Sequence, residues 1–165
     1  MNHNQLDHIL KAHHRDAYLW ARQCCSFKDE MAKDVLQQTY LKILEGQAKL
    51  KDESKVKTWL FSIIRYTAID ELRKAGKIVS LSDSYDPVDI HEEVDRTDYE
   101  GIIKHLPEMQ REVILMVFYH KMTIAQSAEI LQISIGTART HYDRGKKKLK
   151  ELITKVQIQE DYGKQ

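Results

Sequence analysis

Residues 123–149, TIAQSAEILQISIGTARTHYDRGKKKL, decide the fold of the C-terminal half of the chain. Thr123 and Gln126 have the spacing of a capping box, in which each side chain bonds a backbone amide of the other residue. A short turn follows the helix that they open. Ser134 is placed to cap a last helix, which we expect to run to about Ile153. Two helices joined by such a turn predict a helix-turn-helix.

The last helix of this motif has two contrasting faces. Its inner stripe steps by four, three and four residues, through Ala138, Tyr142, Gly145 and Leu149. Its outer face is basic and carries Arg139, Thr140, Arg144, Lys147 and Lys148. Side chains near the helix start could reach base edges, and those further along could hold the DNA backbone. Gly136 and the helix N-terminus favour a phosphate. A tri-helical core motif without a DNA partner is the alternative interpretation of this pattern.

The N-terminal half predicts three helices. The first covers residues 4–25, and the second runs from Asp29, a candidate N-cap, to Gly46, a candidate C′ residue. A polar loop leads to a third helix, which ends near Ala75 with Gly76 as its stop. The third helix contains WLFSII, residues 59–64, so we expect its middle to be buried. Six Gly and two Pro among 165 residues leave little turn chemistry for a sheet, which favours an all-α fold.

The charge pattern divides the chain into three parts. Residues 1–77 carry 14 Lys+Arg against 10 Asp+Glu, residues 78–100 one against eight, and residues 101–165 11 against seven. The net charges are thus +4, −7 and +4. The acidic middle part contains SLSDSYDPVDIHEEVD and has no helical period, which is typical of a flexible linker. We therefore expect two small helical domains, residues 1–77 and 101–165, joined by an acidic linker, residues 78–100.

Composition excludes several classes of protein. No apolar run reaches the roughly 20 residues of a membrane span, and the N-terminus has no secretory signal pattern. The two cysteines, Cys24 and Cys25, are adjacent, so no disulfide framework is expected and the cytoplasm is the expected compartment. His3, His8, His13 and His14 make no compact ligand set with them, so no metal is expected. No phosphate-cradling glycine loop or nucleophile motif occurs, and we expect neither catalysis nor a cofactor.

Three segments in this order resemble the extracytoplasmic-function (ECF) class of bacterial sigma factors, in the sigma-70 family. DVLQQTYLKIL, residues 34–44, is similar to the family's polymerase-binding segment, and KTWLFSIIRYTAIDELRK, residues 57–74, to its promoter-melting segment. Residues 106–149 are similar to its −35-reading domain. The resemblance implies a non-enzymatic subunit that directs RNA polymerase to promoters. It also implies three partners: core RNA polymerase at its clamp and flap, promoter DNA, and an anti-sigma factor, which can be anchored in the membrane.

The resemblance assigns site residues as follows. The residues assigned to polymerase binding are Asp34, Gln37, Gln38, Tyr40 and Leu41. Recognition of the −10 element falls to Lys57, Trp59, Arg65, Tyr66, Arg73 and Lys74. Recognition of the −35 element falls to Ser134, Gly136, Thr137, Arg139, Thr140, His141, Arg144, Lys147 and Lys148. The apolar residues 113–119 are expected to pack internally and to support the flap contact.

The chain departs from the family pattern at several positions. Gln38 replaces an acidic residue, Tyr66 an asparagine and Gln132 a turn glycine. Two other interpretations stay open: a helix-turn-helix regulator that is not a polymerase subunit, and an interaction protein such as a polymerase inhibitor. The α-helical surface charges could also be ordinary solvated charges, and Trp59 is equally a candidate core residue.

Overall fold

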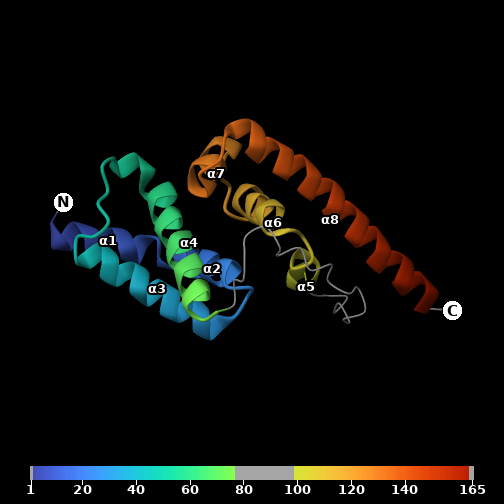
Figure 1. Ribbon diagram of the computed structural model, residues 1–165, viewed down its shortest axis with the longest axis horizontal. Coiled ribbons are helices and arrows are strands. Elements are labelled where there is room, and N and C mark those ends of the chain that lie inside the picture. Colours follow the sequence, from blue (N-terminus) through green and yellow to red (C-terminus); the bar gives the residue numbers. More distant parts are fainter. Residues whose placement is uncertain (1, 77–98, 164–165) are drawn as a thin grey trace. The chain divides into compact units, whose positions relative to one another are not determined.

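The computed structural model describes residues 2–76 and 99–163, and every secondary-structure element among these residues is helical. The all-α prediction is therefore confirmed for this part of the chain. The chain divides into two compact units, Met1–Ser84 and Tyr85–Gln165. Figure 1 draws the first unit in blue to green and the second in yellow to red. The predicted linker lies outside the described residues, except that Tyr99 and Glu100 are helical and correct its C-terminal boundary.

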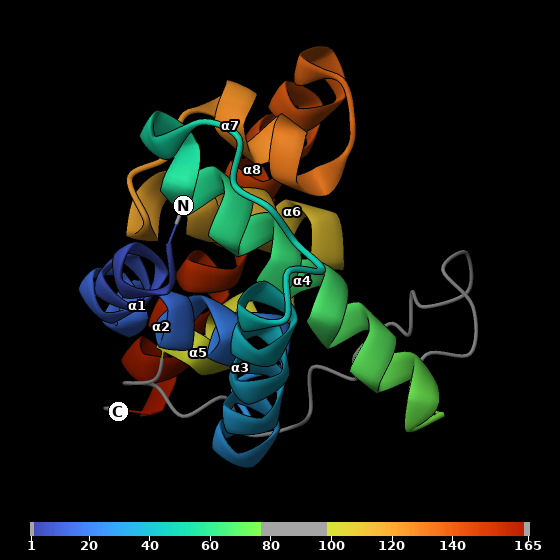
Figure 2. The same ribbon diagram turned by 90° about the vertical axis from the view of Figure 1, so that its left-hand side faces the viewer.

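Four helices enclose the core of the first unit. They are α1 (His3–Ala12), α2 (His14–Cys24), α3 (Asp29–Leu44) and α4 (Val56–Lys74), and a 3-10 turn, η1 (Glu53–Lys55), leads into α4. α2, α3 and α4 contact one another pairwise (Figure 2). At the centre, the fully buried Trp20 stacks on Phe61 with ring centroids 5.3 Å apart and donates its indole N–H to the Phe61 carbonyl at 3.1 Å. The indole thus buries its apolar area without leaving its donor unpaired.

The first predicted helix is interrupted once. His13, with φ −104° and ψ 6°, ends α1 and precedes α2, so the prediction of one continuous helix is wrong. α2 packs against both α3 and α4, whereas the main contacts of α1 beyond α2 are with α3. A bend at His13 lets each segment follow its own neighbours.

The corner between α2 and α3 corrects a second boundary. Asp29 is the first residue of α3 and not its N-cap. Its carboxylate instead accepts hydrogen bonds from the Tyr18 hydroxyl and from Arg22 Nε, each at 2.8 Å. These two bonds, the tyrosine one first, hold the pKa of the Asp29 carboxyl below its ordinary value. The carboxylate therefore ties α2 to the start of α3.

Residues in the left-handed backbone conformation follow several of these helices. Gly46 (φ +78°) and Gly76 (φ +69°) follow α3 and α4, which confirms the predicted helix stops. Ser26 (φ 54°) and Phe27 (φ 63°) adopt the same region between α2 and α3, where each non-glycine residue costs about 1–2 kcal/mol. The Arg22 guanidinium lies 5.4 Å from the Phe27 ring centroid and helps to hold this corner.

The second unit is built around one long helix. α5 (Tyr99–Ile103), α6 (Glu108–Ile114) and α7 (Ile124–Leu131) all pack against α8 (Ile135–Gly163) (Figure 1). α8 continues ten residues past the predicted end at Ile153. The reason is that its apolar stripe continues: Val156 packs, with Leu149 and Ile153, against the cluster of Ile102, Leu106, Ile114 and Leu152. At Gly145 a Cβ would lie 3.0 Å from Ile114 Cγ1, so the glycine permits a close approach of α6.

The apolar residues 113–119 only partly confirm the prediction of internal packing. Residues 113–116 are buried, but Phe118 and Tyr119 are 53% and 51% exposed. Leu115–Tyr119 form a π-helix, η2, and His120 N donates to the Leu115 carbonyl five residues earlier, at 3.1 Å. The wider turn shifts the register of the side chains, which carries the last two aromatic residues away from the core.

Candidate nucleic-acid and protein interfaces

The helix-turn-helix is formed by α7 and α8. The predicted capping box opens α7: Gln126 N donates to Thr123 Oγ1 at 3.0 Å, and Thr123 N donates to Gln126 Oε1 at 2.9 Å. Gln132 takes the left-handed conformation in the turn, at the position where a glycine was expected. Ser134 then caps α8 by accepting from Thr137 N at 3.1 Å, as predicted. These bonds fix where α8 begins and therefore which of its side chains face outward.

The outer face of α8 is largely accessible. Arg139, Arg144 and Lys147 are exposed, and Ala138 on the inner stripe is fully buried. Gly136, Thr137 and Thr140 are also exposed in the first turns. The Thr140 hydroxyl donates to the Gly136 carbonyl at 3.1 Å, which leaves the hydroxyl oxygen free to accept. This arrangement presents donors, one acceptor and positive charge along one helix face, as base and phosphate recognition requires.

Two residues assigned to this surface lie deeper than expected. Lys148 and His141 are half-buried. His141 Nδ1 is buried and makes no hydrogen bond. A side chain in this position reaches DNA less readily than its exposed neighbours, so the sequence pattern overestimated the width of the outer face.

The residues assigned to polymerase binding lie along α3. Asp34, Gln37 and Leu41 are exposed, and Leu41, at 48%, is a large apolar side chain in solvent. Gln38 and Tyr40 are half-buried. α3 therefore presents a mixed polar and apolar strip to solvent.

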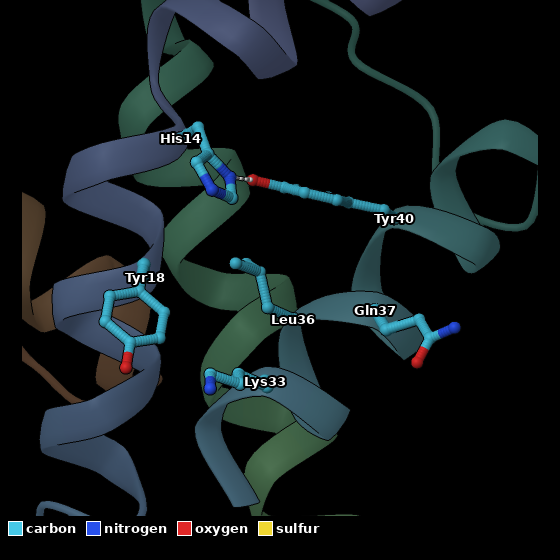
Figure 3. A pocket seen from close by; sticks show the side chains of 6 residues that line it. All are labelled: His14, Tyr18, Lys33, Leu36, Gln37 and Tyr40. Carbon is cyan, nitrogen blue, oxygen red and sulfur yellow. Dashed lines mark hydrogen bonds between the residues drawn. The ribbon is translucent and has the colours of Figure 1, made fainter. Parts of the chain in front are cut away.

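A groove between α2 and α3 adjoins this strip and was not predicted. It has a volume of about 470 Å³ and a mostly apolar lining of His14, Tyr18, Lys33, Leu36, Gln37 and Tyr40 (Figure 3). A hydrogen bond of 2.9 Å joins His14 Nδ1 and the Tyr40 hydroxyl across it. Burial raises the pKa of Tyr40 to about 12, so the hydroxyl keeps its proton at neutral pH. The available sequence signal was one tyrosine on each of the two helices, Tyr18 and Tyr40.

The residues assigned to the −10 element lie along α4. Trp59, Tyr66 and Arg73 recur every seven residues and therefore share one stripe of the helix. Tyr66 is 67% exposed, Arg73 is exposed, and Trp59 is half-buried, so Trp59 is neither a full core residue nor a free stacking surface. Tyr66 and Arg73 together offer an exposed aromatic ring and a cation, which is the chemistry of single-strand binding.

The remaining −10 candidates are engaged within the unit. Lys74 pairs with Asp70 at 3.3 Å and with Glu71 at 3.9 Å. The Lys57 ammonium lies 5.7 Å from the Phe61 ring centroid. Arg65 is half-buried. These side chains must exchange or share their present contacts if they are to meet a phosphate.

Neither cysteine resembles a reactive site. Cys24 and Cys25 form no disulfide and are buried, and burial raises the pKa of Cys25 to about 11. In the described part of the chain no three His, Cys, Asp or Glu side chains come together as metal ligands. Nor does any helix of residues 2–76 and 99–163 combine the length and the apolar composition of a membrane span.

Comparison with known proteins finds family models that match each of the two units. Residues 9–78 match the family model "Sigma-70 region 2", and residues 96–149 match "Sigma-70, region 4". RNA polymerase sigma factor SigZ of Bacillus subtilis is 32% identical over 125 residues, 73% of this chain and 71% of that protein. ECF RNA polymerase sigma factor SigM of Mycobacterium tuberculosis is 28% identical over 150 residues, 89% of this chain and 76% of that protein.

A solved structure is similar to this chain over nearly the full length of both. It is the sigma factor RpoE of Bartonella quintana in complex with the anti-sigma factor NepR, with a TM-score of 0.68 and 25% identity, covering 92% of this chain and 95% of that one. The chain therefore belongs to the ECF class of the sigma-70 family of RNA polymerase sigma factors.

Proposed function

We propose that this chain binds core RNA polymerase and directs it to promoters, with the first unit reading the −10 element and the second reading the −35 element. The observation that carries the proposal is the pairing of two surfaces in one chain. One is the exposed basic face of a helix-turn-helix helix, and the other is an α4 stripe of aromatic and basic side chains. We assign the corresponding domains to residues 1–77 and 99–165, joined by residues 78–98.

In this proposal the −35 element is read by the first turns of α8. Arg139 and Thr140 are exposed there and contact base edges, while Gly136 leaves the backbone open to a phosphate, since nothing lies within 4 Å of its Cβ position. Arg144 and Lys147 lie one to two turns further on and hold the DNA backbone. Phe118 and Tyr119 are the exposed apolar residues that support the flap contact.

The polymerase clamp meets α3 in this proposal. Asp34, Gln37 and Leu41 provide the contact, and the half-buried Gln38 and Tyr40 support it from beneath. Leu41 supplies apolar area that solvent leaves uncovered in the free protein. The chain itself performs no catalysis: binding energy stabilises the melted strand, and the polymerase carries out the chemistry in the cytoplasm.

An anti-sigma factor completes the set of partners. Support comes from the solved relative, which is in complex with the anti-sigma factor NepR. Each unit of this chain also keeps exposed apolar side chains, Leu41 in the first and Phe118 in the second, that a regulatory partner can cover. Two weak contacts on one tethered chain add up to high affinity. A membrane anchor on that partner would couple release to an external signal.

Run-off transcription tests the proposal. Core polymerase alone, core with this chain, and core with the variant Arg139→Ala/Arg144→Ala are compared on genomic fragments, followed by start-site mapping. We expect defined starts only with the unmodified chain. A helix-turn-helix regulator that is not a polymerase subunit would bind DNA without entering the core enzyme in stoichiometric amounts, and an interaction protein would not bind DNA. Either result contradicts the proposal.

A further inference from the structure

Lys42 joins the polymerase-binding helix to the −10 helix. It lies in the last turn of α3, and its ammonium donates to Thr67 Oγ1 on α4 at 3.2 Å. The same ammonium lies over the Tyr66 ring, 5.5 Å from the ring centroid. Lys42 is half-buried, so it is held between the two helices and does not extend into solvent as a surface lysine does. One cation therefore fixes two neighbouring residues of α4.

Tyr66 is an unusual side chain to be fixed in this way. It is 67% exposed, although large aromatic residues are usually mostly buried. An exposed tyrosine normally samples several rotamers, and ordering it costs entropy when a ligand binds. The cation–π contact with Lys42 occupies one ring face and restricts this motion. Even with this contact, the Tyr66 side chain stays largely exposed to solvent.

We propose that Lys42 is a positioning residue for the −10 strand: it holds the Tyr66 ring so that the other face can stack on one unpaired base. The inference rests on the proposed function and deepens it. A base stacks on an aromatic face through its own π-system, so a ring held in advance binds without a further ordering cost. The ammonium also offsets the negative charge of the ring's π-face, which favours face-to-face contact with a base.

Two other roles for Lys42 are distinguishable from this one. A structural role would make the Thr67 hydrogen bond the important contact, and loss of Lys42 would loosen α3 from α4. A direct phosphate contact would make Lys42 act independently of Tyr66 and would contribute to the salt dependence of binding. The positioning role predicts instead that the effect of Lys42 depends on the Tyr66 ring.

The experiment uses holoenzyme reconstituted from core polymerase and the full chain. The probe is fork-junction DNA that carries an unpaired −10 strand from a promoter mapped by run-off transcription. Tyr66→Ala is expected to weaken binding about 5- to 150-fold. Lys42→Met, which keeps the side-chain length, is expected to weaken it about two- to fivefold, and Lys42→Arg to restore most of the loss. In a Tyr66→Ala background Lys42→Met should have no further effect.

Controls separate the positioning role from the others. Affinity for core polymerase, the thermal unfolding midpoint and the salt dependence of fork binding are measured for every variant. A loss with Lys42→Met that persists undiminished without Tyr66, or a smaller salt slope, assigns a direct phosphate contact and overturns the inference. A lower midpoint with unchanged fork binding assigns a structural role and also overturns it. If the unmodified chain supports no run-off transcript, the proposed function fails and the inference fails with it.

Discussion

The contact between α6 and α8 at Gly145 gives a prediction whose magnitude follows from the structure. In Gly145→Ala the new Cβ would lie 3.0 Å from Ile114 Cγ1, 3.3 Å from Gln110 Cβ and 3.3 Å from the Gln110 carbonyl oxygen. Carbon atoms in contact normally lie about 3.5–4.0 Å apart. The isoleucine branch can shift, but the carbonyl oxygen can move only with the backbone of α6.

Two opposing effects decide whether Gly145→Ala raises or lowers the free energy of unfolding of the second unit. Alanine in a helix interior is more favourable than glycine by about 1 kcal/mol. Overpacking of a close contact costs about 1–3 kcal/mol, and the fixed carbonyl places this site in the upper part of that range. We therefore expect Gly145→Ala to lower the free energy of unfolding of the second unit by about 1–2 kcal/mol. Gly136→Ala is the matched control, because nothing lies within 4 Å of its Cβ position in the same helix.

The positions of the two tryptophans allow the unfolding of the first unit to be followed separately. Trp20 and Trp59 both lie in the first unit, so tryptophan fluorescence follows that unit while far-UV circular dichroism follows both. In urea, Gly145→Ala should shift the dichroism transition to lower denaturant and leave the fluorescence transition in place. Gly136→Ala should shift neither to lower denaturant. A Gly145→Ala chain as stable as the Gly136→Ala chain would show that α6 relaxes freely, and would refute the reasoning.

Three further predictions concern binding and pH. Arg139→Ala should weaken promoter binding by about 1–3 kcal/mol and relax the −35 preference, whereas Lys147→Ala should weaken all sequences alike and reduce the salt slope by about one. Equal, sequence-independent losses in binding titrations would contradict these roles. Asp34→Ala should lower affinity for core polymerase in competition with another sigma factor, while Glu53→Ala, also exposed, should not; equal affinities for both variants would contradict the α3 assignment. Asp29→Asn should destabilise the first unit at neutral pH, since the lowered pKa of Asp29 means that its ionised form stabilises the fold. The urea midpoints of Asp29→Asn and the unmodified chain should become equal as the pH falls below about 4 and through the lowered pKa of Asp29. A difference in midpoint that does not depend on pH would exclude the carboxylate as its cause.

Helix-turn-helix geometry was largely predictable from sequence because its signals are local. The capping box at Thr123, the cap at Ser134 and the stripe through Ala138 each depend on side chains within four residues of the backbone groups that they bond or bury. The glycine stops of α3 and α4 were predictable for the same reason. The two family matches confirm the class that these segments resemble.

The features that sequence analysis missed depend on contacts between helices. Lys42 contacts the Tyr66 ring only because α3 ends beside that part of α4. The bend at His13 reflects the different neighbours of α1 and α2. The left-handed pair Ser26 and Phe27 contradicts local preference and is compensated by Arg22 from the preceding helix. No pattern in a single helix encodes such pairings.

The length of α8 has a mechanical consequence. At 1.5 Å per residue its 29 residues form a rod about 43 Å long. The exposed residues Arg139 and Thr140 are near one end, and the stripe ending at Val156 is packed on α5 and α6. Ile158 and Tyr162 are exposed at the far end, 48% and 75% accessible. Because the helix is unbroken, a molecule that binds these last turns contacts the same rigid element that begins at Ile135, and it leaves the first turns uncovered.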